Sequence, residues 1–245
     1  MGKHKPRVIG FGEAHQVKAT AHVRSSLSRF TGEVLPVLGT AKAANLVLET
    51  WAERESCGKA QKAVDTQVRK DTKRPKETQS ELVDLLNALK ERGMGRHGMA
   101  MTCVEYKALL GEDGKVDYAR LLSLITDKLG TLTTGVLGKT TDDSMVVIYG
   151  GALHNDLYPT KGVEQWSYAK RLSEASANGY IEIDLYVPEF IADDETLQTE
   201  TWFELTKSSQ LDKSVLVIER GPRSYVILAK RGVANPRLAK PAKTP

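Results

Sequence analysis

The chain has little cysteine, few aromatic residues and no long hydrophobic run. Only Cys57 and Cys103 are present among its 245 residues, and their spacing is not that of a metal-binding motif. We therefore expect two unpaired thiols, no disulfide scaffold, and a reducing, cytoplasmic location. The longest nearly apolar stretch, 145–153, is much shorter than the ~18 residues that a membrane-spanning helix needs. The basic N-terminus enters a strand-like pattern without a long apolar segment, so no signal peptide is expected.

The positive net charge of +4 comes from the two ends of the sequence. Residues 1–7 and 229–245 hold eight basic and no acidic residues; subtracting these eight from 35 leaves 27 basic residues against 31 acidic ones in 8–228. A mildly acidic body argues against a nucleic-acid-binding domain, whose basic residues would cover the folded surface. We expect a basic leader at 1–6, one folded domain at 7–232 and a disordered basic tail at 233–245.

Hydrophobic patterning predicts strands that alternate with helices. This order is typical of a single α/β domain with a mixed sheet, in which parallel core strands are flanked by helices and followed by a C-terminal antiparallel hairpin. The strand at 180–187 alternates apolar and polar residues and is expected to have one wet face. The remaining expected elements are strands at 7–11, 45–48, 99–104 and 145–149, helices at 17–38, 80–92 and 117–129, a loop at 130–141, and hairpin strands at 214–220 and 224–230.

Reactive side chains follow the carboxyl ends of the first four predicted strands. Glu13 and His15 follow the first, Glu49 the second, Glu105 the third and His154 the fourth. In open α/β sheets the ligand crevice lies at this edge, so residues far apart in sequence are expected to converge there. Two of the clusters share a Gly-x-x-His pattern, in which glycine permits a tight turn after a buried strand.

Each histidine of these patterns is expected at the start of the following helix. The positive end of the helix lowers the histidine pKa and favours the neutral imidazole, which can act as a base or a metal ligand. Together with Glu13 and Glu49, His15 and His154 could bind a divalent metal ion or activate water directly. The alternative is that the histidines only cap helices and Glu49 only forms a salt bridge. His22 and Arg29 either extend the site or lie on a solvated helix face.

Several common catalytic signatures are missing or incomplete. Gly10-Phe11-Gly12 begins like a dinucleotide-binding loop, but His15 stands at the third glycine position. The stretch 138–140 resembles a phosphate-binding loop but precedes a strand instead of following one. No Gly-x-Ser-x-Gly and no His-Glu-x-x-His is present. A serine hydrolase and a zinc peptidase of the His-Glu-x-x-His type are therefore disfavoured.

The segments VIGFGEAHQ, LVLET and VVIYGGALHN resemble the superfamily of erythromycin esterases, ChaN-like haem-binding proteins and TraB/Tiki proteins. The resemblance implies a mixed α/β fold with two histidines facing each other across a cleft. Erythromycin esterases hydrolyse a macrolactone, Tiki-like members are metal-dependent peptidases, and ChaN-like members bind haem. The sequence departs from the family in lacking Thr-His-Gly, in keeping only His22 of a histidine pair, and in offering no evident site arginine. The matching residues are Gly12, Glu13, His15, Glu49, Gly151 and His154.

The leading prediction is a hydrolase that cleaves an ester, lactone or amide (peptide) bond of a small-molecule or peptide substrate. His15 is the expected general base or metal ligand, and His154 stabilises the transition state or completes a metal site with His15 and Glu49. Glu13 and Glu49 orient the histidines, or Glu49 coordinates a divalent metal ion. The alternatives are a haem-binding protein without catalysis, and an interaction protein whose basic cluster at 69–76 contacts acidic partners. No nucleic-acid partner and no membrane span are expected.

Overall fold

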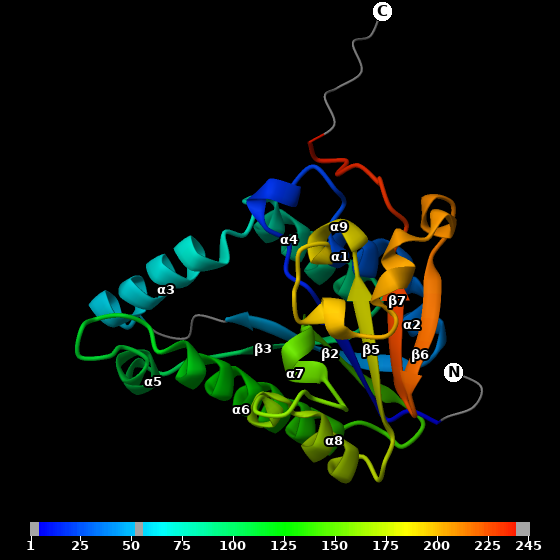
Figure 1. Ribbon diagram of the computed structural model, residues 1–245. Helices are drawn as coiled ribbons and strands as arrows, with labels where there is room; N and C mark the ends of the chain where they lie inside the picture. The colour runs from blue at the N-terminus through cyan, green and yellow to red at the C-terminus, as the bar shows by residue number, and fades with distance from the viewer. Residues whose placement is uncertain (1–4, 52–55, 239–245) are drawn as a thin grey trace, which may run out of the picture.

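A seven-stranded mixed sheet forms the centre of the computed structural model, which describes residues 5–51 and 56–238 (Figure 1). The strand order is β3-β2-β4-β1-β5-β7-β6. Neighbouring strands are parallel except for the antiparallel β6–β7 pair, which confirms the predicted fold class. The strands are β1 (Val8–Glu13), β2 (Ala43–Trp51), β3 (Gly95–Met99), β4 (Met145–Gly151), β5 (Tyr180–Tyr186), β6 (Leu216–Gly221) and β7 (Ser224–Leu228).

Helices cover both faces of the sheet, so the central strands are apolar on both sides. Val8 and Ile148 pack on one face with α6 (Tyr118–Leu137) and α8 (Ala169–Ala175), while Phe11 packs on the other face. That second face is covered by α1 (Ser26–Arg29), α2 (Leu35–Thr40) and α4 (Glu77–Glu91). The other helical segments are α3 (Gly58–Thr72), α5 (Cys103–Ala108), α7 (Ala152–Asn155), α9 (Pro188–Ile191), a π-helical turn η2 (Phe30–Val34), and the 3-10 turns η1 (Lys18–Thr20), η3 (Glu164–Trp166), η4 (Leu197–Thr199), η5 (Phe203–Lys207) and η6 (Ser209–Asp212).

Four sequence predictions of local structure were wrong. The helix expected at 17–38 begins only at Ser26, after the 3-10 turn Lys18–Thr20, so His15 lies in a turn and not at the start of a helix. The expected loop at 130–141 mostly belongs to α6, because Thr133 and Val136 continue its buried face and Gly130 lies against α8. The third strand lies at Gly95–Met99 instead of 99–104, since Thr102 starts α5 through a capping box. Strand β5 has no wet face: it lies between β1 and β7, and its polar side chains point into the protein.

The two cysteines form a disulfide, which corrects the expectation of two free thiols. Cys57 and Cys103 are 46 positions apart in the sequence. They meet because β2 and β3 are parallel neighbours, so the chain leaves both strands at the same edge of the sheet and begins α3 and α5 side by side. The expected reducing compartment rested on unpaired thiols and loses that basis.

The structure also moves the expected start of the C-terminal tail. Asn235 is buried, its backbone N–H donates to the His22 carbonyl at 2.8 Å, and its side chain donates to Ala21 at 3.0 Å. Residues 233–238 therefore belong to the folded body. The rest of the expected tail, 239–245, and positions 1–4 of the expected leader, including His4, lie outside the described residues. Within the described part of the chain, each helix is too short or too polar to cross a membrane.

Candidate functional site

Three side chains are connected by hydrogen bonds at the turn after β1. His15 Nδ1 lies 2.9 Å from Glu13 Oε1, and the Tyr149 hydroxyl donates to the other oxygen of the same carboxylate. Burial and the adjacent Glu13 charge raise the pKa of Tyr149 well above its usual value, so its hydroxyl keeps its proton. Because a carboxylate only accepts hydrogen bonds, the contact assigns the imidazole proton to Nδ1. The lone pair of His15 is then on Nε2.

Glu49, at the end of β2, faces this lone pair. Its Oε1 lies 3.9 Å from His15 Nε2, and its Oε2 accepts the backbone N–H of Gly151 at 2.6 Å. Burial alone would raise the pKa of Glu49. Positive charge on His15 and His154 when these rings are protonated outweighs that effect, with smaller help from Arg74 and the Gly151 hydrogen bond, and holds the pKa below its usual value. Glu49 is therefore a carboxylate that stays ionised although its side chain is only 12% exposed.

The two glycines that end β4 make this approach possible. A Cβ atom on Gly150 would lie 2.6 Å from Glu49 Oε2 and 2.9 Å from Glu49 Cβ. A Cβ atom on Gly151 would lie 3.2 Å from His15 Nε2. Only a residue without a side chain at Gly150 leaves room for the carboxylate beside the strand. The two glycines before His154 thus leave room for the side chains of His15 and Glu49.

His154 lies in α7 and is 3% exposed. Its Nδ1 lies 3.0 Å from the Trp166 carbonyl and 2.8 Å from Thr126 Oγ1. Since a carbonyl only accepts, Nδ1 carries a proton. The charge of His154 lowers the pKa of Glu49. The structure therefore brings together the predicted residues Glu13, His15 and Glu49, whereas among the described residues no hydrogen bond joins His154 to any of them.

Two further residues belong to this site and were missed from the sequence. Tyr149 lies in a strongly apolar strand, where an aromatic residue is ordinarily part of the core. Arg74 follows α3, and its segment reaches the site because the Lys18 backbone N–H donates to the Lys73 carbonyl at 2.9 Å. The charge of Arg74 lowers the pKa of Glu49. The basic cluster at 69–76 was visible in the sequence, but no local pattern indicates that one of its members turns toward Glu49.

Other polar residues considered from the sequence lie in structural positions. Glu105 completes the capping box of α5 and pairs with Lys128 at 2.8 Å. His97 Nε2 lies 2.9 Å from the Asn45 side chain. Arg29 is 2% exposed and donates to the Lys230 carbonyl at 2.9 Å, so it is not on a solvated face.

The predicted metal ligands all form hydrogen bonds within the protein. Among the described residues, no group of three or more His, Cys, Asp or Glu side chains is arranged to hold a metal ion. The expected ligands His15, Glu49 and His154 use Nδ1, Oε2 and Nδ1, respectively, in hydrogen bonds to protein atoms. These hydrogen bonds leave His15 Nε2, His154 Nε2 and Glu49 Oε1 open to a substrate, a water molecule or a metal ion. The chemistry below is derived from the side chains alone.

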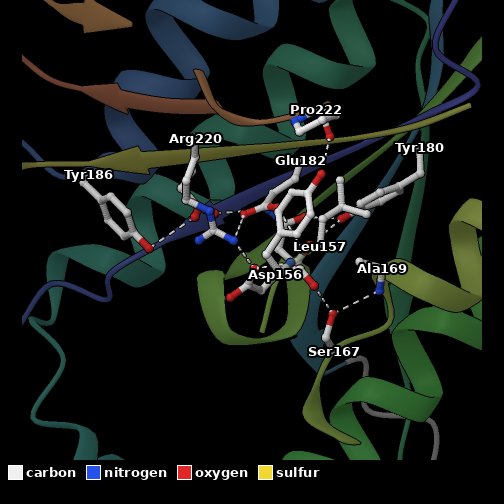
Figure 2. Close-up of polar contacts among 12 residues, drawn as sticks. Asp156, Leu157, Ser167, Ala169, Tyr180, Glu182, Tyr186, Arg220 and Pro222 are labelled. Atoms are coloured by element: carbon white, nitrogen blue, oxygen red, sulfur yellow. Dashed lines mark hydrogen bonds and ion pairs between the residues drawn. The ribbon is translucent and has the colours of Figure 1, made fainter. Parts of the chain in front are cut away.

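A buried acidic cluster lies where Glu182 and Arg220 approach the chain after α7, at Asp156 and Leu157 (Figure 2). Glu182 and Asp184 point from the same face of β5; Arg220 forms an ion pair with Asp156, and its Nη2 lies 3.4 Å from Glu182 Oε1. Burial, followed by repulsion from Asp184, raises the pKa of Glu182 to about 9. Glu182 is therefore protonated near neutral pH, and the cluster holds fewer negative charges than carboxyl groups.

No protein-family model and no curated protein sequence matches this chain. Among solved structures it is similar to the type III effector HopBA1, with 12% identity over 91% of this chain and 88% of that one and a TM-score of 0.44. It is also similar to a Bacillus cereus protein, with 11% identity, 75% and 66% coverage and a TM-score of 0.41. A third similar structure is RRSP, a MARTX toxin effector domain from Vibrio vulnificus, with 18% identity, a TM-score of 0.33 and coverage of 63% of this chain but only 29% of that one. Likenesses this distant assign neither family nor function to the chain.

Proposed function

We propose that the protein is a hydrolase of an ester, lactone or amide bond in which His15 is the general base. The observation that carries the proposal is the 2.9 Å contact between Glu13 and His15 Nδ1, with Tyr149 behind it. A carboxylate in this position holds the imidazole in one tautomer and stabilises the imidazolium that forms when Nε2 takes a proton. The sequence motifs shared with the erythromycin esterase, ChaN and Tiki superfamily support the same proposal.

Water is the nucleophile that this geometry suits. His15 Nε2 and Glu49 Oε1 are 3.9 Å apart, which is too far for a direct hydrogen bond but allows one water molecule to bond to both. His15 takes one proton from this water as its oxygen attacks the substrate carbonyl. The ionised Glu49 stabilises the positive charge that develops on the imidazole.

His154 and Arg74 serve the second half of the reaction. The Trp166 carbonyl holds one proton of His154 on Nδ1, so His154 that enters the cycle as the imidazolium carries its second proton on Nε2 and donates it to the leaving oxygen or nitrogen. The positive charge of Arg74 favours the oxyanion of the tetrahedral intermediate. The proton gained by His15 and the proton lost by His154 are then exchanged with solvent, so the site returns to its starting state.

Turnover of a panel of p-nitrophenyl esters, lactones and peptide amides tests the proposal. We expect His15→Ala to lower kcat/KM by about 100-fold or more, the scale of a positioned general base. His97→Gln is the matched control, because it changes a partly buried histidine that contacts Asn45 instead of the site. Equal turnover of the wild type and His15→Ala on every substrate would refute the assignment.

The same purified protein distinguishes the other chemistries that the sequence left open. Elemental analysis that finds a stoichiometric divalent metal, lost in His15→Ala or His154→Ala, supports the metal-dependent version of the hydrolase. A stoichiometric, shifted Soret band after addition of haem, abolished by the same substitutions, supports a haem-binding protein instead. Activity without either result supports water activation by His15 alone.

A further inference from the structure

We propose that Asn155 and Asp184 are positioning residues that set the place of His154 in the site. This inference rests on the proposed hydrolase function. It concerns the polar network beside α7, which forms no hydrogen bond with His15, Glu13 or Glu49 among the described residues. Asn155 and Asp156 directly follow His154 in the sequence, close enough to orient it, to orient a ligand or to cap the next helix.

The chain that leaves His154 is fastened at three consecutive positions. Asn155 Nδ2 donates to Asp184 Oδ1 at 3.1 Å, and the Leu157 backbone N–H donates to Glu182 Oε2 at 2.8 Å. Between them, Asp156 pairs with Arg220 (Figure 2). The acceptors lie on β5 and the guanidinium on β6, so the sheet itself holds the exit of α7.

Asn155 is held on its other side as well. The Tyr180 hydroxyl lies 2.9 Å from the Asn155 backbone oxygen and also contacts the Asn155 side-chain oxygen. Asn155 is fully buried, so each of these bonds is made without competition from water. A side chain that accepts from Tyr180 and donates to Asp184 has only one orientation available to its amide.

Strand β1 is shaped to admit this network. A Cβ atom on Gly10 would overlap Asn155 Oδ1 and the Tyr180 hydroxyl, and one on Gly12 would overlap Asp184 Oδ1. Gly10-Phe11-Gly12 is not part of a complete dinucleotide-binding motif. The close approach of Asn155, Tyr180 and Asp184 explains why its two glycines are needed. The same strand carries Glu13 at its end, so one strand sets the spacing between the His15 and His154 halves of the site.

The network therefore holds His154 through the residue that follows it. The ring is held at Nδ1 by Trp166 and Thr126, while the backbone one residue later is held by β5. A catalytic group must be placed within a fraction of an ångström, and a misplacement of 1 Å can cost about 100-fold in rate. Loss of the Asn155–Asp184 bond is expected to move His154 without removing any group that touches substrate.

Exchanging the hydrogen-bond donor Asn155 and the acceptor Asp184 tests the proposal. Asn155→Asp places two carboxyl groups against each other, whereas Asn155→Asp combined with Asp184→Asn restores one donor and one acceptor in reversed order. Both readouts are taken at one pH: the His154 ring signal in NMR spectra, which is assignable because the chain has five histidines, and kcat and KM on the best substrate. Ser176→Ala is the control, since it removes a buried hydroxyl that bonds to backbone carbonyls, including that of Leu172, elsewhere in the fold.

We expect Asn155→Asp to shift the His154 signal and to lower kcat about tenfold or more with little change in KM. The double variant should restore the signal and most of kcat, and Ser176→Ala should change neither. A His154 signal unchanged in a folded Asn155→Asp protein, or a double variant no better than the single one, would overturn the proposal. If Asn155→Asp does not fold, Tyr180→Phe, which only deletes the hydroxyl bonded to Asn155, must produce the same signal shift.

The two readouts separate this inference from the proposed function. The ring signal reports the position of His154 whether or not the protein hydrolyses any substrate. A shifted signal in a protein without hydrolase activity supports positioning and refutes the hydrolase. Hydrolase activity that depends on His15, together with an unmoved signal, refutes positioning alone.

Discussion

Replacing Cys57 and Cys103 with serine should destabilise the protein more than most pairs of surface substitutions. The disulfide closes a loop with a sequence separation of 46 residues. In the chain-entropy description, a loop of this length restricts the unfolded chain enough to contribute about 4 kcal/mol to the free energy of unfolding at 25 °C. Strain in the folded protein and residual structure in the unfolded chain both reduce that contribution, so about 4 kcal/mol is an upper figure.

Helix α3 buries one of its side chains against its neighbours. Gln67 accepts the Val116 backbone N–H at 3.0 Å, the Tyr118 hydroxyl donates to Asp71 at 2.7 Å, and Val64 is its one fully buried apolar side chain. Helix α3 also lies in sequence between Glu49 and Arg74, two residues of the site. We therefore expect the double serine variant to lose amide-exchange protection first in α3 and α5, and only then elsewhere.

Urea unfolding followed by circular dichroism measures the effect. The oxidised wild type should exceed the double serine variant by 2 to about 4 kcal/mol, and reductant should bring the wild type to the same midpoint as the variant. Reductant added to the double variant is the control and should change nothing. Equal midpoints for the oxidised wild type and the variant, or wild-type thiols that are freely alkylated before unfolding, would show that the reasoning is wrong.

Three further predictions concern other parts of the structure. Folding raises the pKa of Glu182 from near 4.5 to about 9, so between these pH values the folded state binds a proton that the unfolded state has lost. The free energy of unfolding should therefore fall as pH rises from about 5 to 9, by at most about 1.4 kcal/mol per pH unit. Glu182→Gln should flatten that slope in urea melts, and an unchanged slope would contradict the assignment. Gly150→Ala should displace Glu49, which would lie 2.6 Å from the new Cβ atom, and lower kcat/KM on any substrate found, while Gly135→Ala, which adds a Cβ atom in open space, serves as its control. Leu129→Ala, at a fully buried position in α6, should cost about 2–5 kcal/mol in chemical unfolding, and a cost below about 1 kcal/mol would mean that the cavity closes.

The candidate site was largely predictable because parallel strands impose a simple rule. Glu13, Glu49 and His154 follow different strands, and a parallel sheet brings the ends of all its strands to one edge. Hydrophobic runs were enough to locate those ends. The third strand shows the limit: its polar residues made it hard to recognise, so Glu105 was assigned to the wrong kind of position.

What could not be predicted depends on contacts between distant segments. Tyr149 has a role only because Glu13, 136 positions away, turns toward its hydroxyl. The disulfide depends on β2 and β3 being neighbours, which is a property of strand order and is not written in either segment. The polar residues of β5 alternate like those of a half-exposed strand, but here they face a buried partner network instead of water.

The position of β1 in the sheet has a consequence for how the protein is made. Val8 pairs with Val146 on one side and with Tyr180 on the other, so β1 is a central strand whose partners are synthesised much later. Such distant pairings slow folding, and until they form the apolar segment of β1 stays exposed and prone to aggregation. We expect nascent chains that stop before β5 to remain bound to chaperones. The turn that carries His15 acquires its surroundings only after β4, which holds Tyr149 and Gly151, has been synthesised.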